Sequence, residues 1–396
     1  MTTSSLASLL GVSGSSGLPI GAYAQFPAGA PTLIQQGVSE FLLNGAVVDY
    51  AAKYADAVAK APWIVNNKLP ASAFAAQMTN IVKSGSYCVG LASGGIRRST
   101  DMTNWETIAV SGIGSSPYSL CASGNYLCAG NSTTSIIYSA NNGASWAAIP
   151  TTALAAAPKF ILRANNTWAA FTATFNGTQS EYATQSAENP GAYAWTVRNQ
   201  GSVLLNSVSC AAASPSLFVL GGSNNSDSSG RIYTSADAVS WTLRHTATSS
   251  VQKIVYTGAK FFAIVTSGRD LVSSATGSGT WATDANKPVS SNEFYTYLDI
   301  CSDGAGVVVA ITTESGVVGI RVSTDHGVTW SPQKTLSGTN LSPSARISFV
   351  QGLSLAIVYS GSASYIVDYS AIGQARWVGT TEASTAAPGV SYVRIL

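Results

Sequence analysis

Seven of the nine tryptophans recur at a nearly constant spacing, and this recurrence constrains the fold more than any other feature of the 396-residue chain. The intervals between successive members of the series are 41, 49, 46, 40, 49 and 47 residues. A period of about 45 residues is typical of one blade of a β-propeller, which consists of four antiparallel strands. The series is Trp105, Trp146, Trp195, Trp241, Trp281, Trp330 and Trp377.

The residues that precede each tryptophan recur as well. The fullest copy is Ser-Thr-Asp-His-Gly-Val-Thr-Trp, which contains Asp325 and Gly327 and ends at Trp330. In such a hairpin the Asp or Asn side chain accepts hydrogen bonds from backbone N–H groups two residues on, and the glycine supplies a positive φ. We therefore interpret the repeated polar residue as a structural part of the turn and not as a catalytic group. Its other copies are Asp101, Asn141 and Asp237.

Further strand patterns lie upstream of each turn. In the sixth repeat the second of these patterns, residues 306–312, is almost wholly apolar, which is typical of a strand buried on both faces between neighbouring blades. Trp168 falls in such a strand and is predicted to be a core residue rather than a platform for a ligand. Residues 390–396 are predicted to return as the first strand of blade one beside residues 87–91, with residues 78–82 competing for the same place.

On these residues, positions 75–396 resemble the Asp-box, or bacterial neuraminidase repeat, family of β-propellers. The family motif is Ser-x-Asp-x-Gly-x-Thr-Trp, and residues 323–330 fit it at every fixed position. The fold class predicted is all-β: a seven-bladed propeller of four-stranded antiparallel blades over residues 71–396, preceded by a small α/β module. Sialidases, xyloglucanases, sorting receptors and photosystem assembly factors share this turn, so the resemblance implies a fold and no single function.

Residues 1–70 contain no copy of the repeat and form the predicted N-terminal module. Residues 46–60 are predicted to form a helix, because Val47, Tyr50, Ala51 and Tyr54 mark one face. Pro62 would end that helix.

The same segment resembles the phage tail-collar module of many tail fibres. Pro19 and Gly21, Phe26, the Leu-Leu-Asn-Gly run at 42–45 and Tyr54 match its motifs, whereas Asn44 stands where Asp is commoner and Val58 lies near an expected Leu. The resemblance implies a virion protein made in the host cytoplasm and present in several copies, which residues 1–70 attach to other tail proteins. The alternative is a generic small cap that plugs the propeller.

Composition excludes several other functions. The chain has 20 basic and 18 acidic residues, so no basic excess exists to neutralise nucleic-acid phosphates. The chain contains no run of ~20 apolar residues, so no membrane span is predicted. The two histidines and five cysteines, which include no C-x-x-C pair, predict neither a metal site nor a cofactor, and the cysteines are expected to be small buried apolar residues.

A glycosidase requires two carboxyl groups in its active site, ~5 Å apart in a retaining enzyme or ~6.5–9.5 Å apart in an inverting one. The candidate carboxylates outside the turns are Asp227, Asp284, Glu181, Glu293 and Glu314, and their positions in the sequence do not identify a pair. A sialidase would also carry an Arg-Ile-Pro sequence, which this chain lacks. We therefore assign no catalytic residue.

A binding function is instead predicted for the loops opposite the repeated turns. Loops between strands two and three of a blade share a face with the loops between blades, and here they are rich in Ser, Asn and Thr. Such loops suit hydroxyl-rich ligands, although they also suit a merely soluble surface. The predicted ligand-binding residues are Asn224, Asp227, Asp284, Glu293 and Tyr295. A tail adhesin for a host-surface glycan, a glycan-degrading hydrolase and a purely architectural tail subunit remain as alternatives.

Overall fold

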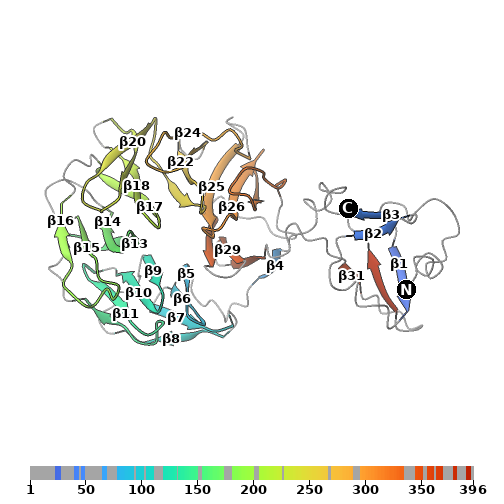
Figure 1. Ribbon diagram of the computed structural model, residues 1–396, viewed down its shortest axis with the longest axis horizontal. Helices are drawn as coiled ribbons and strands as arrows, with labels where there is room; N and C mark the ends of the chain where they lie inside the picture. Colours follow the sequence, from blue (N-terminus) through green and yellow to red (C-terminus); the bar gives the residue numbers. More distant parts are fainter. Residues whose placement is uncertain are drawn as a thin grey trace. The chain divides into compact units, whose positions relative to one another are not determined.

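The computed structural model describes most of residues 78–368, with short gaps, and the strands at residues 23–27, 40–43, 46–49, 65–68, 378–380 and 389–393. The chain divides into two compact units (Figure 1). The smaller unit combines Met1–Ile64 with Asp368–Leu396, and the larger unit is Val65–Val367.

The larger unit consists of seven successive groups of antiparallel strands, which we call blades one to seven. In chain order they are β5 (Met78–Ser84), β6 (Tyr87–Ala92), β7 (Gly95–Ser99) and β8 (Glu106–Ile108); β9 (Ser119–Ser123), β10 (Tyr126–Gly130), β11 (Ile136–Ser139) and β12 (Ala147–Ala148); β13 (Pro158–Ala164), β14 (Thr167–Thr172), β15 (Tyr182–Gln185) and β16 (Thr196–Arg198); β17 (Ser207–Ser214), β18 (Leu217–Ser223), β19 (Gly230–Ser235) and β20 (Thr242–Ala247); β21 (Lys253–Tyr256), β22 (Phe261–Val265), β23 (Asp270–Ser274) and β24 (Ala282–Thr283); β25 (Tyr295–Ser302), β26 (Val308–Glu314) and β27 (Val317–Ser323); and β28 (Arg346–Val350), β29 (Leu355–Ser360) and β30 (Ala363–Asp368) with β4 (Val65–Lys68).

These blades lie side by side around a common axis, which makes the larger unit a β-propeller, as the tryptophan spacing predicts (Figure 1). Six blades have four strands each in the described residues, and the sixth blade in chain order has three. A parallel pair, Val350 opposite Ile81, joins blade seven to blade one. The described part of the chain contains strands and no helix, and none of its elements meets the length and hydropathy of a membrane-spanning helix.

The core lies between the blades, as expected from the apolar second strands. All five residues of β22 are buried, and Trp168 on β14 has no exposed surface, which confirms its predicted place in the core. Five clusters of buried apolar side chains each join two successive blades. In one of them Phe171 of blade three packs against Phe218 of blade four. Full burial of one such side chain contributes about 1.5–3 kcal/mol.

The recurring tryptophans pack backwards onto the preceding blade. Trp241 of blade four lies edge-on to Phe171 of blade three, with ring centroids 5.7 Å apart, and Trp330 of blade six meets Phe262 of blade five at 6.3 Å. Trp146, Trp195 and Trp281 likewise join the clusters shared with the blade before them. Trp105 is half-buried, and Trp377 lies outside the described residues.

In the smaller unit, β1 (Tyr23–Pro27) and β31 (Val378–Thr380) flank β32 (Gly389–Val393), and β2 (Glu40–Leu43) pairs with β3 (Ala46–Asp49). The predicted helix over residues 46–60 is therefore wrong at its start. The register of Leu43 with Ala46 leaves Asn44 and Gly45 as a two-residue connection, a sequence that favours a hairpin, and β-branched Val47 and Val48 suit a strand. Residues 50–60 lie outside the described part.

The predicted closure of the ring is also wrong. Strand β32 pairs with β1 and β31, not with β6. The first strand of blade one is β5, which contains the competing residues 78–82. The ends of the ring meet instead through β4, which supplies the outer strand of blade seven by pairing with β30. Residues 368–396 accordingly group with the N-terminal residues, whereas the sequence placed them in the propeller.

Candidate functional site

The propeller has two chemically different ends. The repeated turns join strands three and four of a blade, and the antiparallel order of the strands places them at the same end as the hairpins between strands one and two. The loops between strands two and three, and those between blades, lie at the opposite end. We call these ends the turn face and the loop face.

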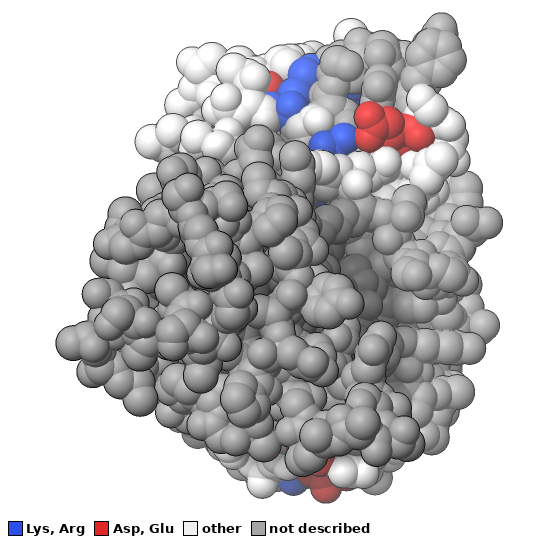
Figure 2. All heavy atoms as spheres, turned by 90° about the vertical axis from the view of Figure 1, so that its right-hand side faces the viewer, with Lys and Arg blue, Asp and Glu red and all other residues white. Residues whose placement is uncertain are grey.

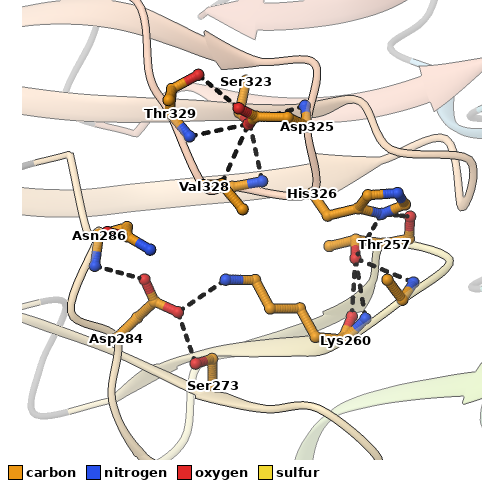
Figure 3. Close-up of polar contacts among 12 residues, drawn as sticks. Thr257, Lys260, Ser273, Asp284, Asn286, Ser323, Asp325, His326, Val328 and Thr329 are labelled. Carbon is orange, nitrogen blue, oxygen red and sulfur yellow. Dashed lines mark hydrogen bonds and ion pairs between the residues drawn. The ribbon is translucent and has the colours of Figure 1, made fainter.

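At the turn face, Asp325 organises the turn of blade six (Figure 3). Its Oδ1 accepts hydrogen bonds from the N–H groups of Val328 and Thr329 at 3.1 and 2.8 Å and from the Ser323 hydroxyl at 2.7 Å. Its Oδ2 accepts one from the Thr329 hydroxyl at 2.6 Å. The Ser323 hydroxyl in turn accepts from the Gly327 N–H at 2.8 Å. These contacts occupy the carboxylate within its own turn.

The same arrangement recurs in other blades. Asp101, Asn141 and Asp237 each accept a hydrogen bond from the serine two residues earlier, at 3.0, 2.9 and 2.8 Å. Each also accepts from a backbone N–H two to four residues later. In blade five the Thr276 hydroxyl accepts from the Gly279 N–H at 2.9 Å, so a hydroxyl takes the place of the carboxylate there.

The turns also bind the preceding blade. Gly327 has a φ of +78°, and a Cβ atom there would lie 2.4 Å from Cζ of Phe262 in blade five. The neighbouring His326 places Nδ1 2.9 Å from the Thr257 carbonyl oxygen of blade five (Figure 3). The turn of blade six therefore packs against blade five, and its Asp residue stabilises the turn that makes this contact.

The Asp325 turn gives a pH-dependent prediction. Burial opposes the charge of Asp325, but hydrogen bonds from Thr329, Ser323 and Val328 outweigh it and hold the pKa of the carboxyl below its usual value near 3.8. The carboxylate therefore stabilises the fold above about pH 4, and this contribution disappears as the pH falls through the lower folded pKa. Asp325→Asn should lower the free energy of unfolding at pH 7 by less than about 1 kcal/mol, because the group is half-exposed and Asn141 shows that an amide can fill this place. Urea unfolding should show this difference shrinking as the pH falls below about 4; a difference that grows in acid would contradict it.

On the loop face, the β18–β19 connection contains two of the predicted ligand residues. Asn224 is buried, and its N–H donates to the Ser229 carbonyl at 2.9 Å. Asp227 is 47% exposed and accepts from Arg231 at 2.9 Å and from the Ser229 hydroxyl at 2.6 Å. Hydrogen bonds from Ser229 and the charge of Arg231 hold the pKa of Asp227 below its usual range. This connection thus presents an ionised carboxylate and a guanidinium side by side.

Asp284, a third predicted ligand residue, is 5% exposed, and both of its carboxylate oxygens accept hydrogen bonds from other residues of the protein (Figure 3). Its Oδ2 accepts from Lys260 Nζ at 2.9 Å and from the Ser273 hydroxyl at 2.6 Å, and its Oδ1 accepts from the Asn286 N–H at 2.9 Å. The Lys260 ammonium also lies 4.4 Å from the ring centroid of Phe262. The structure therefore places Asp284 in a buried network of blade five and not on the surface with Asp227.

Two further carboxylate candidates, Glu314 and Glu181, lie among the described residues. Glu314 pairs with Arg321 at 2.8 Å, and Glu181, immediately before β15, is buried. Glu293 lies outside the described residues, and Tyr295 is described only as the first residue of β25. In the view of Figure 2, the basic and acidic side chains of the described residues lie next to one another rather than in patches of one sign. Within the described residues, no group of three or more His, Cys, Asp or Glu side chains could hold a metal ion.

The cysteines have the character that the sequence predicts, with one difference. All five are free, four are buried and Cys121 is half-buried. Burial raises the pKa of Cys121 and of Cys210 to about 12. These thiols therefore stay protonated and are poor nucleophiles.

Sequence reasoning missed one polar cluster, on the innermost strands. Lys253 on β21 lies 3.2 Å from Asp299 Oδ1 on β25. Asp299 is 3% exposed, and it also accepts from the N–H groups of Ile300 and of Ile347 on β28, both at 2.9 Å. One carboxylate thus links blades five, six and seven. The sequence signal that could have identified this cluster is a charged residue immediately before an isoleucine in the first strand of three repeats. The three charged residues are Lys253, Asp299 and Arg346.

No model of a known protein family matches the chain, and no curated protein matches it. Its structure is similar to that of YCF48 bound to D1 peptide, with 17% identity and a TM-score of 0.55 over 81% of this chain and 96% of that one. YCF48 from Cyanidioschyzon merolae aligns with 15% identity and a TM-score of 0.52 over 76% and 97% of the two chains. A GH74 enzyme from Niastella koreensis aligns with 15% identity and a TM-score of 0.53 over 74% of this chain and 44% of that one. At these identities the similarity is one of β-propeller fold alone.

Proposed function

We propose that the chain is a phage tail protein whose propeller recognises a host-surface glycan and whose residues 1–70 attach it to other tail proteins. The attachment role rests on the resemblance of residues 19–58 to the tail-collar module. The recognition role rests on the loop face, whose connections are rich in Ser, Asn and Thr. Amide, hydroxyl and charged groups of this kind pair with sugar hydroxyls.

Binding without hydrolysis is supported above all by the occupied carboxylates. Glycoside hydrolysis requires one carboxyl group free to donate a proton and another free to attack or to activate water. Asp284 and Glu314 are tied up in ion pairs with Lys260 and Arg321, and Asp325 is held within its turn. Asp227 is exposed but has Arg231 as its neighbour. This arrangement favours a recognition surface over a hydrolase.

The proposal predicts saturable binding of the full chain to polysaccharide from its host bacterium, without release of reducing sugar. Asp227→Ala should weaken that binding about tenfold, because a charge-assisted hydrogen bond to a sugar hydroxyl is lost. Glu106→Ala is the matched control, since Glu106 is similarly exposed at 52% and pairs with Arg98 on the outer part of blade one. Equal losses in the two variants would remove the β18–β19 connection from the site.

Two other results would reject the proposal itself. Release of reducing sugar from the polysaccharide would identify a hydrolase. Absence of binding across a panel of host surface glycans would favour an architectural tail subunit. Deletion of residues 1–60 should leave a propeller that binds glycan but no longer joins the particle, and continued incorporation into particles would exclude the anchoring role.

A further inference from the structure

The innermost strands carry a charge imbalance that the rest of the chain does not share. The chain as a whole is nearly balanced, with 20 basic and 18 acidic residues. The seven innermost strands, β5, β9, β13, β17, β21, β25 and β28, contain five basic residues and one acidic residue, Asp299. The basic residues are Lys83, Lys159, Arg163, Lys253 and Arg346.

Three of these cations lie at the loop face. Lys253 and Arg346 are the first residues of β21 and β28, and Lys159 is the second residue of β13. First strands begin at the loop face, because each follows a loop between blades. Lys83 and Arg163 lie near the other ends of their strands, and Arg163 is already engaged with the Ser123 hydroxyl and the Trp168 ring. We call Lys159, Lys253, Arg346 and Asp299 the inner basic cluster.

The members of the cluster lie within a row of inner strands in which each strand contacts the next, from β13 through β17, β21 and β25 to β28. Asp299 contacts the Lys253 ammonium, and it also accepts from the N–H of Ile347, the residue that follows Arg346. Strand β17, which contains Cys210, contacts both β13, which contains Lys159, and β21, which contains Lys253. The cluster therefore extends over the inner strands of blades three to seven.

The one carboxylate does not neutralise these cations. Asp299 is saturated by Lys253 and two backbone N–H groups and has almost no exposed surface. The Lys253 side chain is 37% exposed, and one contact leaves two of its three donors for another partner. Lys159 and Arg346 are exposed, and Arg346 uses one guanidinium nitrogen on the Ala345 carbonyl. The three cations thus keep donors exposed to solvent, whereas the one acidic residue of these strands is buried.

We propose that the inner basic cluster binds the carboxylate of an acidic sugar. A sugar carboxylate would accept from Arg346 in the bidentate geometry that guanidinium favours and from the free donors of Lys253. Asp299 acts as a positioning residue, because it fixes the Lys253 ammonium between blades five and six. This inference rests on the proposed glycan-binding function and specifies the charge of the glycan.

The test compares oligogalacturonate with its fully methyl-esterified form, in which every carboxylate is replaced by an uncharged methyl ester. Calorimetric titration of the full chain should show binding of the acid and at least tenfold weaker binding of the ester. Arg346→Gln and Lys253→Gln should each weaken binding of the acid about tenfold. Arg244→Gln, which removes an exposed cation on β20, the outer strand of blade four, should leave it unchanged. Arg346 has no ion pair among the described residues, so its replacement should leave the folding transition in place even if Lys253→Gln lowers it.

Equal affinity for the acid and the ester, or an equal effect of Arg244→Gln and Arg346→Gln, would overturn the inference. Competition by inorganic phosphate at the concentration of the sugar would show a general anion site and would also overturn it. If host polysaccharide binds but oligogalacturonate does not, the inference fails while the proposed function stands. If neither binds, both fail.

Discussion

Replacing Gly327 with alanine should lower the free energy of unfolding by about 3 kcal/mol. A φ of +78° costs an L-residue about 1–2 kcal/mol, and the new methyl group would lie 2.4 Å from Cζ of the fully buried Phe262. Overpacking of a dense core adds about 1–3 kcal/mol. Because the clash is between blades five and six, the loss should appear in urea unfolding of the whole propeller and not only as local exchange in one turn.

Gly316→Ala separates the two causes of this loss. Gly316 has nearly the same backbone conformation, with a φ of +81°, but no atom lies within 4 Å of its would-be Cβ. This variant should lose only the conformational part, about 1 kcal/mol. If both replacements lower the free energy of unfolding equally, the close approach of the turn to Phe262 adds nothing to the loss in Gly327→Ala.

Replacing Asp284 with alanine should cost about 3 kcal/mol of unfolding free energy, because it leaves the Lys260 ammonium without its carboxylate in a nearly dry site. This loss of stability should be seen in urea unfolding of the protein without any ligand, because the Asp284 carboxylate contacts only other groups of blade five. The paired replacement Asp284→Leu with Lys260→Met should recover most of it, since an apolar pair of similar volume removes the uncompensated charge.

Asp227→Ala is the control for this prediction, because Asp227 is exposed and its ion pair with Arg231 is screened by water. It should leave the unfolding midpoint unchanged. A loss of glycan affinity without a loss of stability in Asp284→Ala would reverse our assignment and return Asp284 to the ligand site.

The tryptophan series was enough to predict the propeller, because the five indoles from Trp146 to Trp330 each pack on the blade before them and so recur with the blade. The closure of the ring was not predictable in the same way. Strand β4 reads Val-Asn-Asn-Lys, which has no alternation of apolar and polar residues, and its partner β30 lies almost 300 residues later. Pairing of this kind depends on the geometry of the closed ring and leaves no local pattern.

The candidate site was only partly predictable for a related reason. Loop composition shows that a segment tolerates water, but it does not show whether a carboxylate is already paired. Asp284 meets Lys260 across 24 residues because β22, β23 and β24 are successive strands of one blade. Asp299 meets the backbone of Ile347 across 48 residues because two blades adjoin. Such pairs are determined by tertiary structure, so Asp284 looked free in the sequence and the inner basic cluster was overlooked.

The pairing of β4 with β30 has a mechanical consequence. Val65 lies opposite Val367, so the polypeptide enters and leaves the propeller at one edge of the same blade. The smaller unit contains residues from both sides of this point and is joined to the propeller by two covalent links. A protease that severs one link leaves the other intact, and a pulling force on the smaller unit is shared between two strands that are loaded in the same direction.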